Sequence, residues 1–354
     1  MAKGCVRKRS PGSYQLLWRE PGTGKQRTKT FVGTKRDAER EMTEIQRSLN
    51  NGTYTPPTKT TVGEFLLTWL EGHSAIAPTS KHRYRIAIEK HLTPAFGHYR
   101  LSALRPIDIQ GVYSRWKAEG LSPRTIKLHH AILHKAMETA MRLELISRNP
   151  ADAVDAPPAS RDGKRVLTDD EITQLLKETR DSPHYIPIVL GVTVGLRLGE
   201  VCGLSWDDID LENAQLTVNR TAAVVGKELT LRELPKTKSS RRTVALPAVA
   251  VEALASIPKE GRFVYTAKGE GPAHPDLASK SIKALCRSLG KPVTMHGLRH
   301  THASHLMRGN IHPKVVSARL GHSTTGITMD TYSHLLPDNQ RLAAAHVDKL
   351  VTSD

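Results

Sequence analysis

The 354-residue sequence predicts a multidomain chain that is mainly α-helical and carries small β-sheets. Hydrophobic residues make up 38% of the chain and aromatic residues only 5%, a balance that favours helical domains over an aromatic-rich β-fold. Helical periodicity dominates much of the sequence after residue 60. Stretches rich in Pro and Gly divide the chain into three segments, which its length accommodates as separate small domains.

The first segment, residues 1–57, predicts a small β-sheet followed by one helix. Residues 12–19 alternate between two faces as a strand does, a Pro-Gly turn follows at 21–25, and residues 26–32 form a returning strand. Residues 35–49 then have helical spacing with one apolar face.

The charge balance points to a polyanionic partner. Net charge is +17 and the sequence pI is about 9.9, and residues 1–60 alone carry 13 Lys and Arg against 5 Asp and Glu. A two-stranded ribbon fits the major groove of DNA, so the first segment is expected to contact DNA directly. The candidate contacts are Trp18, Arg19, Lys25, Arg27 and Lys29. The alternatives are a solvated hairpin that only aids solubility, and a basic protein of another kind, such as a ribosome-associated one.

The second segment, residues 58–155, predicts four helices, at 62–70, 81–91, 107–119 and 123–145. Breaks are expected at Pro78, Pro94, Gly97 and residues 120–123. Basic outer faces suggest a helical DNA clamp, and a bundle with a merely solvated face is the competing interpretation. Residues 156–165 are rich in Pro and Gly and read as a linker.

The third segment, residues 166–354, predicts a mixed α+β domain. Thr168 and Glu171 form a capping box that starts a helix, helices continue to Gly203, and a β-rich stretch covers residues 216–246. Helices follow to the end, where residues 342–350 again have helical spacing.

Cysteine content and hydropathy indicate the compartment. The three cysteines are far apart and odd in number, which fits a reducing cytosol better than a disulfide framework. No apolar run approaches the length of a membrane span, and the basic N-terminus lacks an apolar signal core. We therefore expect a soluble, intracellular protein with no membrane partner.

The last segment contains paired arginines suited to a phosphate. Arg197 lies between two predicted helices, where its side chain can reach into a groove, and Glu200 one turn later can orient it. His296 and Arg299 share a helical face and can address one phosphate together. Two guanidiniums match the oxygens of a pentacoordinate phosphorus, although an Arg-Leu-Gly-Glu segment alone is usually a helix start with a surface ion pair.

A basic turn lies between the predicted strands 229–234 and 243–246. Lys236 at such a hairpin tip can give a proton to a departing 5′-oxygen, and Lys238 is close enough in sequence to compete for that role. The competing interpretation, strongest for Lys238, Arg241 and Arg242, is a grip on backbone phosphates.

His322 and Tyr332 complete the set. A tyrosine phenol has a pKa of about 10, so as a nucleophile it needs a proton acceptor and cationic surroundings. Attack on a phosphodiester stores the bond energy in a phosphotyrosine, which removes the need for ATP, and no GxxxxGK[ST] loop is present. The nearby His300, His302 and His305 lack the acidic partner of a HExxH zinc site, so we expect packing or backbone-bonded histidines and no metal or other cofactor.

The ordered set Arg197, Lys236, His296-x-x-Arg299, Leu320-Gly321-His322 and Tyr332 resembles the tyrosine recombinase family, in its phage-type integrase branch. The resemblance covers the whole chain and implies an arm-binding domain, a core-binding domain and a catalytic domain. It implies that Arg197 and Arg299 bind the scissile phosphate, Lys236 is the general acid, His296 accepts the tyrosine proton, His322 bonds the phosphate and Tyr332 forms a 3′-phosphotyrosyl link.

The resemblance also implies the partners. They are double-stranded DNA at core and arm attachment sites, three further copies of the chain in a tetramer, a DNA-bending host factor and an excision-directing protein, all in a bacterial cytoplasm at the nucleoid. The C-terminal helix would dock on a neighbouring protomer, with an intramolecular cap as the alternative. The leading hypothesis is an integrase of a prophage or integrative element. The alternatives are a resolvase of chromosome dimers, a type IB topoisomerase and a non-catalytic DNA-binding regulator.

Overall fold

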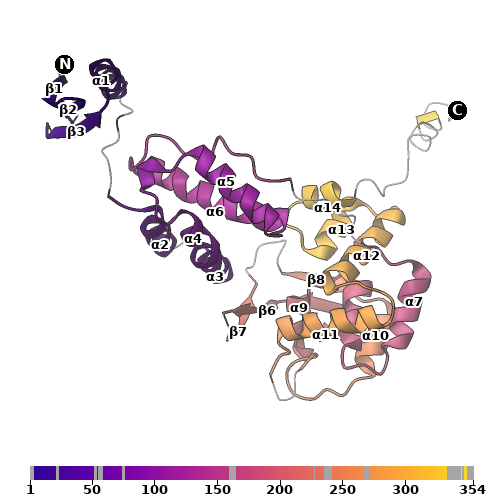
Figure 1. Cartoon of the computed structure of the whole chain (residues 1–354). Coiled ribbons are helices and arrows are strands. Elements are labelled where there is room, and N and C mark those ends of the chain that lie inside the picture. The colour runs from indigo at the N-terminus through magenta and orange to yellow at the C-terminus, as the bar shows by residue number, and fades with distance from the viewer. Residues whose placement is uncertain are drawn as a thin grey trace. The chain divides into compact units, whose positions relative to one another are not determined.

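The computed structural model describes residues 4–20, 24–51, 54, 59–73, 76–158, 165–226, 228–234, 241–266, 271–332, 344 and 347–348. The chain forms two compact units, residues 1–161 and 162–354, and the boundary falls within the predicted linker. Helices with small sheets make up both units, which confirms the predicted fold class (Figure 1). No helix among these residues is long and apolar enough to cross a membrane.

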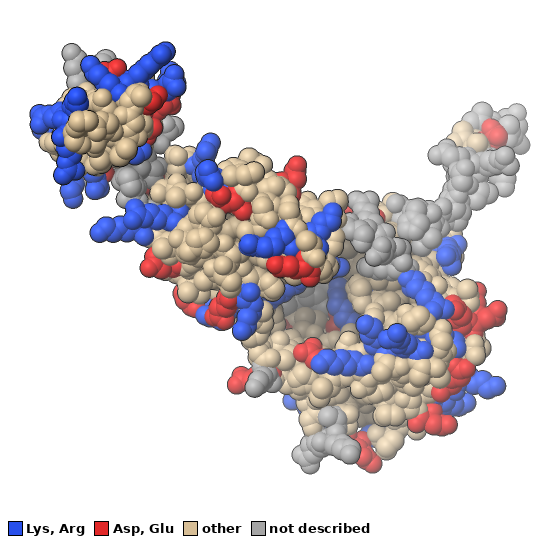
Figure 2. Space-filling view, in the orientation of Figure 1, with Lys and Arg blue, Asp and Glu red and all other residues tan. Residues whose placement is uncertain are grey.

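The first unit begins with a three-stranded antiparallel sheet of order β1-β2-β3 and one helix. Its elements are β1 (Cys5–Ser10), β2 (Ser13–Arg19), β3 (Gln26–Val32) and α1 (Lys35–Asn50). Strand β1 was not predicted. The core of this module contains Leu16, Trp18, Ala38 and Met42, so α1 packs on one face of the sheet. Figure 2 shows Lys and Arg side chains projecting around the visible outline of the module.

Helices build the rest of the first unit around a separate core that includes Trp69, Phe96, Tyr113 and Leu133. They are α2 (Val62–Gly72), α3 (Pro78–Ala87), the π-helical turn η1 (Ile88–Leu92), α4 (Thr93–Phe96), the 3₁₀ turn η2 (Leu101–Ala103), α5 (Pro106–Ala118) and α6 (Pro123–Arg142). The predicted break at Pro78 is present, because α2 ends at Gly72 and Pro78 starts α3, where its missing N–H costs nothing. The break predicted at Pro94 was wrong, because η1 carries the helix past this residue with a wider turn.

The second unit packs most of its helices around a core that includes Leu175, Val189, Val201, Leu254 and Ile282. The helices are α7 (Asp169–Glu178), α8 (Tyr185–Val189), the π-helical turn η3 (Leu190–Val194), α9 (Leu198–Cys202), the 3₁₀ turn η4 (Trp206–Asp208), α10 (Ala248–Ala255), α11 (Pro275–Ser288), α12 (Met295–Arg308), α13 (Pro313–Leu320) and α14 (Thr325–Tyr332). The capping box predicted at Thr168 is present at the start of α7.

Two small sheets accompany these helices, and their pairing corrects one prediction. Strands β4 (Ile209–Asp210), β5 (Gln215–Val218) and β8 (Arg242–Ala245) form one sheet, while β6 (Arg220–Val225) and β7 (Glu228–Glu233) form the other. Because β7 pairs with β6 and β8 with β5, β7 and β8 do not form the predicted hairpin with each other. The hairpin turn instead begins at Gly226, whose φ of +67° suits glycine.

Helices α12, α13 and α14 pack against one another and place the end of α14 beside α12 (Figure 1). A small apolar cluster of Ala303, Met307, Val316, Leu320 and the ring of Tyr332 holds them together. Apart from residues 344, 347 and 348, the predicted helix at 342–350 lies outside the described residues, as do Lys236 and Lys238.

Candidate active site

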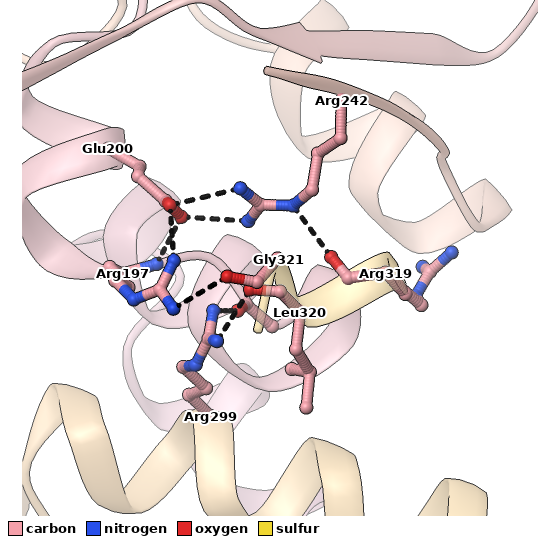
Figure 3. A network of polar contacts seen from close by, with 8 residues as sticks. Arg197, Glu200, Arg242, Arg299, Arg319, Leu320 and Gly321 are labelled. Atoms are coloured by element: carbon pink, nitrogen blue, oxygen red, sulfur yellow. Dashed lines mark hydrogen bonds and ion pairs between the residues drawn. The ribbon is translucent and has the colours of Figure 1, made fainter. Parts of the chain in front are cut away.

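Arg197 is held where α9 begins, by a carboxylate one turn along. Glu200 accepts hydrogen bonds from the Arg197 backbone N–H and from Nη1, both at 2.8 Å. The Arg197 Nη2 donates to the carbonyl oxygen of Gly321 at 3.0 Å. Glu200 is only 4% exposed, whereas the Arg197 side chain is 45% exposed. The guanidinium is therefore oriented by buried groups and still presents an open side to a ligand (Figure 3).

Arg242 approaches Glu200 from the other side, which corrects its prediction as a DNA contact. Its Nη1 and Nη2 donate to Oε1 and Oε2 of Glu200 at 3.0 and 2.9 Å, and Nε donates to the Arg319 carbonyl at 2.8 Å. The side chain is 6% exposed. Strand β8 is paired with β5 inside the unit, so this arginine faces the protein interior, whereas its neighbour Arg241 is exposed.

Arg299 reaches the same place from α12 and is buried. Its Nη1 donates to the Gly195 carbonyl at 2.7 Å and its Nη2 to the Leu320 carbonyl at 2.6 Å. Burial, with Arg197 adding to it, lowers the pKa of Arg299 to about 9, so the guanidinium stays charged at neutral pH. Two helix ends supply the carbonyls that hold the two arginines: Gly195 (φ +80°) ends η3 and Gly321 (φ +64°) ends α13.

The charges at this site do not balance. The guanidiniums of Arg197 and Arg242 bind Glu200, and those of Arg299 and Arg319 lie close enough to affect or be affected by these charges (Figure 3). Burial raises the pKa of Glu200, whereas the ion pairs with Arg242 and Arg197 lower it. The ion pairs have the larger combined effect, so the pKa lies below the usual range and the carboxylate is ionised at neutral pH. Among the residues that the structure describes, Glu200 is the one carboxylate that bonds these arginines, and backbone carbonyl oxygens accept the other hydrogen bonds of Arg197, Arg242 and Arg299. Such an excess of fixed positive charge is suited to an anion with several oxygens.

His322 follows Gly321 at the end of α13 and is a neutral imidazole at pH 7. Burial and, after it, the positive charges of Arg299 and Arg197 together lower its pKa to about 4. Its Nδ1 lies 2.8 Å from the Thr328 hydroxyl, which orients the ring. A neutral, oriented imidazole beside the arginines can hydrogen-bond an anion without adding charge.

Tyr332 ends α14 and is 4% exposed. Its hydroxyl hydrogen-bonds Nδ1 of His300, and Nε2 of His300 lies 3.0 Å from Nε2 of His296. Burial raises the pKa of the Tyr332 phenol to about 12, against the opposing effect of the Arg299 charge. The family resemblance implied that His296 accepts the Tyr332 proton. In the structure, His300 lies between His296 and the Tyr332 hydroxyl.

The other two histidines of α12, buried His302 and partly exposed His305, bond backbone carbonyls, and His305 also pairs with Asp169. His302 has Nδ1 3.1 Å from the Val192 carbonyl and accepts from Arg319 Nε at 3.1 Å, and His305 Nε2 lies 2.7 Å from the Leu167 carbonyl. Both match the expectation of backbone-bonded residues, whereas His300 does not. Sequence reasoning set His300 aside with them, although its place one turn after His296 was a usable signal. Among the described residues no group of three His, Cys, Asp or Glu side chains is arranged to hold a metal ion.

The predicted contacts of the first segment divide into two sets. Trp18 is 6% exposed in the core, with its ring edge-on to Tyr54, so its prediction as a DNA contact was wrong. Pairing of β2 with β3 puts Arg27 and Lys29 on the same face as Trp18 and Leu16, where they bond Glu20 and Glu41 with side chains 37% and 51% exposed. Alternation places Arg19 on the opposite face, and it is exposed, as is Lys25 in the loop before β3.

Comparisons with known proteins match both units. Residues 165–339 match the model described as phage integrase family, and residues 61–117 match the phage integrase N-terminal SAM-like domain. The chain is 26% identical to a XerC-like tyrosine recombinase of Caldanaerobacter subterraneus, over 92% of this chain and 93% of that protein. It is 23% identical to the ICEBs1 integrase of Bacillus subtilis, over 98% and 100%.

Two solved structures share the fold. The Tn1549 transposon integrase in complex with a circular intermediate DNA superposes with a TM-score of 0.72 at 22% identity, covering 82% of this chain and all of that one. A lambda integrase dimer bound to a core site superposes with a TM-score of 0.61 at 20% identity, covering 95% of each chain.

Proposed function

Because this chain belongs to the phage integrase family of tyrosine recombinases, we propose that the arginine network around Glu200 is the active site of its DNA strand exchange. The protein is a site-specific DNA recombinase that integrates and excises a prophage or an integrative element. The observation that carries the assignment of the site is the convergence of Arg197, Arg299 and His322 beside Tyr332.

The phosphate of the cleaved strand is the anion that this charge excess accommodates. Arg197 bonds the carbonyl of Gly321, and Arg299 bonds the carbonyl of the preceding residue, Leu320. Both guanidiniums therefore lie at the end of α13. In the transition state the pentacoordinate phosphorus carries extra negative charge, which pre-positioned cations in a partly buried site stabilise strongly. His322, held neutral, donates or accepts at the remaining oxygen.

The reaction exchanges one phosphodiester for another. The Tyr332 oxygen attacks phosphorus and loses its proton, the bond from phosphorus to the 5′-oxygen breaks, and the 5′-oxygen takes a proton from Lys236. The product is a 3′-phosphotyrosyl link, and attack by a new 5′-hydroxyl reverses the steps. No cofactor enters the balance. Lys238 is the alternative acid in the same connection between β7 and β8.

The remaining parts of the chain deliver DNA to this site. We assign arm-type binding to residues 1–57, with Arg19 and Lys25 as contacts, core-type binding to residues 58–155, and catalysis to residues 166–354. Four protomers act together on two DNA sites, with a DNA-bending host factor and an excision-directing protein, in the bacterial cytoplasm. We also assign a contact with the DNA backbone to Arg241, which is exposed, whereas its sequence neighbour Arg242 is buried.

Covalent capture tests the site. Tyr332→Phe should bind core-site DNA as the wild type does and yield no protein–DNA adduct on a nicked suicide substrate, because the phenolic oxygen is the nucleophile. The adduct is measured as labelled DNA that migrates with the polypeptide after denaturation. Adduct formation by the variant, or none by the wild type, would refute the assignment.

Truncation tests the domain assignment. Removal of residues 1–55 should spare cleavage of core sites while binding to arm sites is lost, as measured by mobility shift with each DNA. Arm-site binding that survives the truncation would contradict the role of the first segment.

A further inference from the structure

Helix α12 places two imidazoles in line with the Tyr332 hydroxyl. His296 and His300 are one turn apart on the same face of the helix, with ring centroids 4.4 Å apart and planes at 83°. The His300 ring lies 5.5 Å from the Tyr332 ring, and its Nδ1 hydrogen-bonds the phenol. His300 therefore contacts the atom that attacks phosphorus, and His296 contacts His300 through its Nε2.

If both imidazoles are neutral and the phenol donates its hydrogen bond, these contacts allow only one placement of the ring protons. The Tyr332 hydroxyl donates to Nδ1 of His300, so the proton of the neutral His300 ring is on Nε2 and is donated to Nε2 of His296. When the phenol loses its proton, Nδ1 of His300 gains it. The resulting imidazolium faces the phenolate on one side and the lone pair of His296 on the other.

We propose that His300 is a catalytic residue, which takes the Tyr332 proton during attack and returns it during religation, and that His296 is a positioning residue that acts through it. This proposal rests on the proposed role of Tyr332 as nucleophile. In the step, the phenolic O–H bond breaks as an N–H bond forms at His300 Nδ1, and the phenolic oxygen bonds phosphorus as the 5′-oxygen leaves.

The surroundings explain why a direct acceptor is needed. Tyr332 is buried, and burial raises the pKa of its phenol, so the phenolate is scarce without a base. The charged and titratable groups around the pair are His296 and Arg299 from α12, His322 after α13 and Arg197 before α9, while Arg319 of α13 bonds His302. Among these groups His300 is the one whose hydrogen bond to the phenol the structure shows.

The test uses the full chain and two core-site substrates, one with the natural 5′-oxygen and one with sulfur at that position. A thiol, with a pKa of about 8.5, leaves without a proton, so sulfur removes the need for a general acid but not for a base. His300→Ala should slow adduct formation between about 100-fold and 10,000-fold at pH 7 on both substrates, the range for a lost general base. Lys236→Ala, in contrast, should be rescued by sulfur.

The pH profile separates proton transfer from mere packing. The deficit of His300→Ala should narrow between pH 7 and pH 9.5, because solution hydroxide increasingly generates the phenolate. His300→Asn places an acceptor near the position of Nδ1 but cannot take a proton, so it should bind DNA and remain slow. His296→Ala should lose less rate than His300→Ala. The matched control is His305→Gln, on the same helix against the Leu167 carbonyl, which should keep wild-type rates.

Several outcomes would overturn the proposal. They are a His300→Ala rate within threefold of His305→Gln, a deficit that does not change with pH, rescue by sulfur, or a greater loss in His296→Ala. If wild type forms the adduct and Tyr332→Phe does not, any of these results refutes only the role of His300. If the wild type forms no adduct, or Tyr332→Phe forms one, the proposed function fails as well.

Discussion

Arg242 and Glu200 form a buried, bidentate ion pair, with Nη1 to Oε1 at 3.0 Å and Nη2 to Oε2 at 2.9 Å. The same carboxylate orients Arg197, whose guanidinium is half exposed. Strand β8 thus supports the start of α9 through Glu200 and the end of α13 through the Arg319 carbonyl. Half-exposed Arg197 is thus held by a carboxylate that buried Arg242 also binds.

Arg242→Ala should lower the free energy of unfolding of the second unit by about 3 kcal/mol, because it breaks a buried pair while Arg197 still bonds Glu200. The matched control is the exposed neighbour Arg241→Ala, which should change stability by less than about 0.5 kcal/mol and weaken DNA binding. Urea denaturation and binding titrations measure both quantities. Equal stability losses in the two variants would contradict the difference in burial.

Glu200→Gln should reveal a stability contribution that depends on pH in a defined window. Burial raises the pKa of this carboxyl, but the Arg242 and Arg197 pairs lower it more, so its folded pKa lies below 4.5. The contribution is therefore complete above pH 4.5 and is lost as pH falls through the folded pKa. The stability gap between wild type and variant, measured by denaturation, should be constant from pH 8 to pH 5 and shrink below that. A gap that already shrinks near pH 6 would disprove this pairing.

Gly195→Ala should damage both stability and catalysis. Its φ is +80°, and an added Cβ would lie 2.6 Å from His302 Cδ2 and 2.9 Å from Leu320 Cδ2. Gly290 provides the control, because its φ is +70° and an added Cβ meets nothing within 4 Å. Gly290→Ala should cost about 1–2 kcal/mol from backbone strain alone and leave the adduct rate unchanged. Gly195→Ala should lower the free energy of unfolding by more than Gly290→Ala does, and it should slow adduct formation because the carbonyl that holds Arg299 moves. Equal stabilities and equal adduct rates of the two variants would contradict this role of Gly195.

Trp18→Ala and Arg19→Ala should separate folding from DNA contact in the first segment. Loss of the Trp18 side chain from the small core of β2 and α1 should cost about 3–5 kcal/mol and raise hydrogen exchange throughout the sheet. Arg19→Ala should leave exchange unchanged and reduce the salt dependence of arm-site binding by about one phosphate contact. Unchanged exchange in Trp18→Ala would show that the side chain is not a core residue.

Local patterns in the sequence predicted most of the elements. The helices at 35–50 and 106–118 lie within two residues of their expected bounds, because apolar spacing and capping residues act over a few residues. The capping box at Thr168 and Glu171 is an interaction of the same range. The sequence also predicted the residue types of the candidate site. Guanidiniums, imidazoles and a phenol in that order indicate the chemistry, even though the sequence does not give the distances between them.

Interactions between distant segments escaped the same reasoning. Strands β7 and β8 are consecutive, so the sequence predicted a hairpin. In the structure, β7 pairs with β6 and β8 pairs with β5, and both partners lie earlier in the chain. Adjacent arginines 241 and 242 are chemically identical, and only the pairing of β8 with β5 turns one of them inward. Trp18 was read as an exposed contact because its strand alternates, and alternation does not tell which face a helix covers.

The sequence by itself determined the fold class, the local elements and the chemical groups available for strand exchange, because those follow from short-range spacing and residue chemistry. Only the tertiary structure decided that His300 lies on the Tyr332 hydroxyl and that Glu200 has arginines on both sides. Those contacts join residues up to 42 positions apart, and packing of whole helices and sheets brings them together. The periodicity of a single helix or strand does not predict contacts between elements that are distant in sequence.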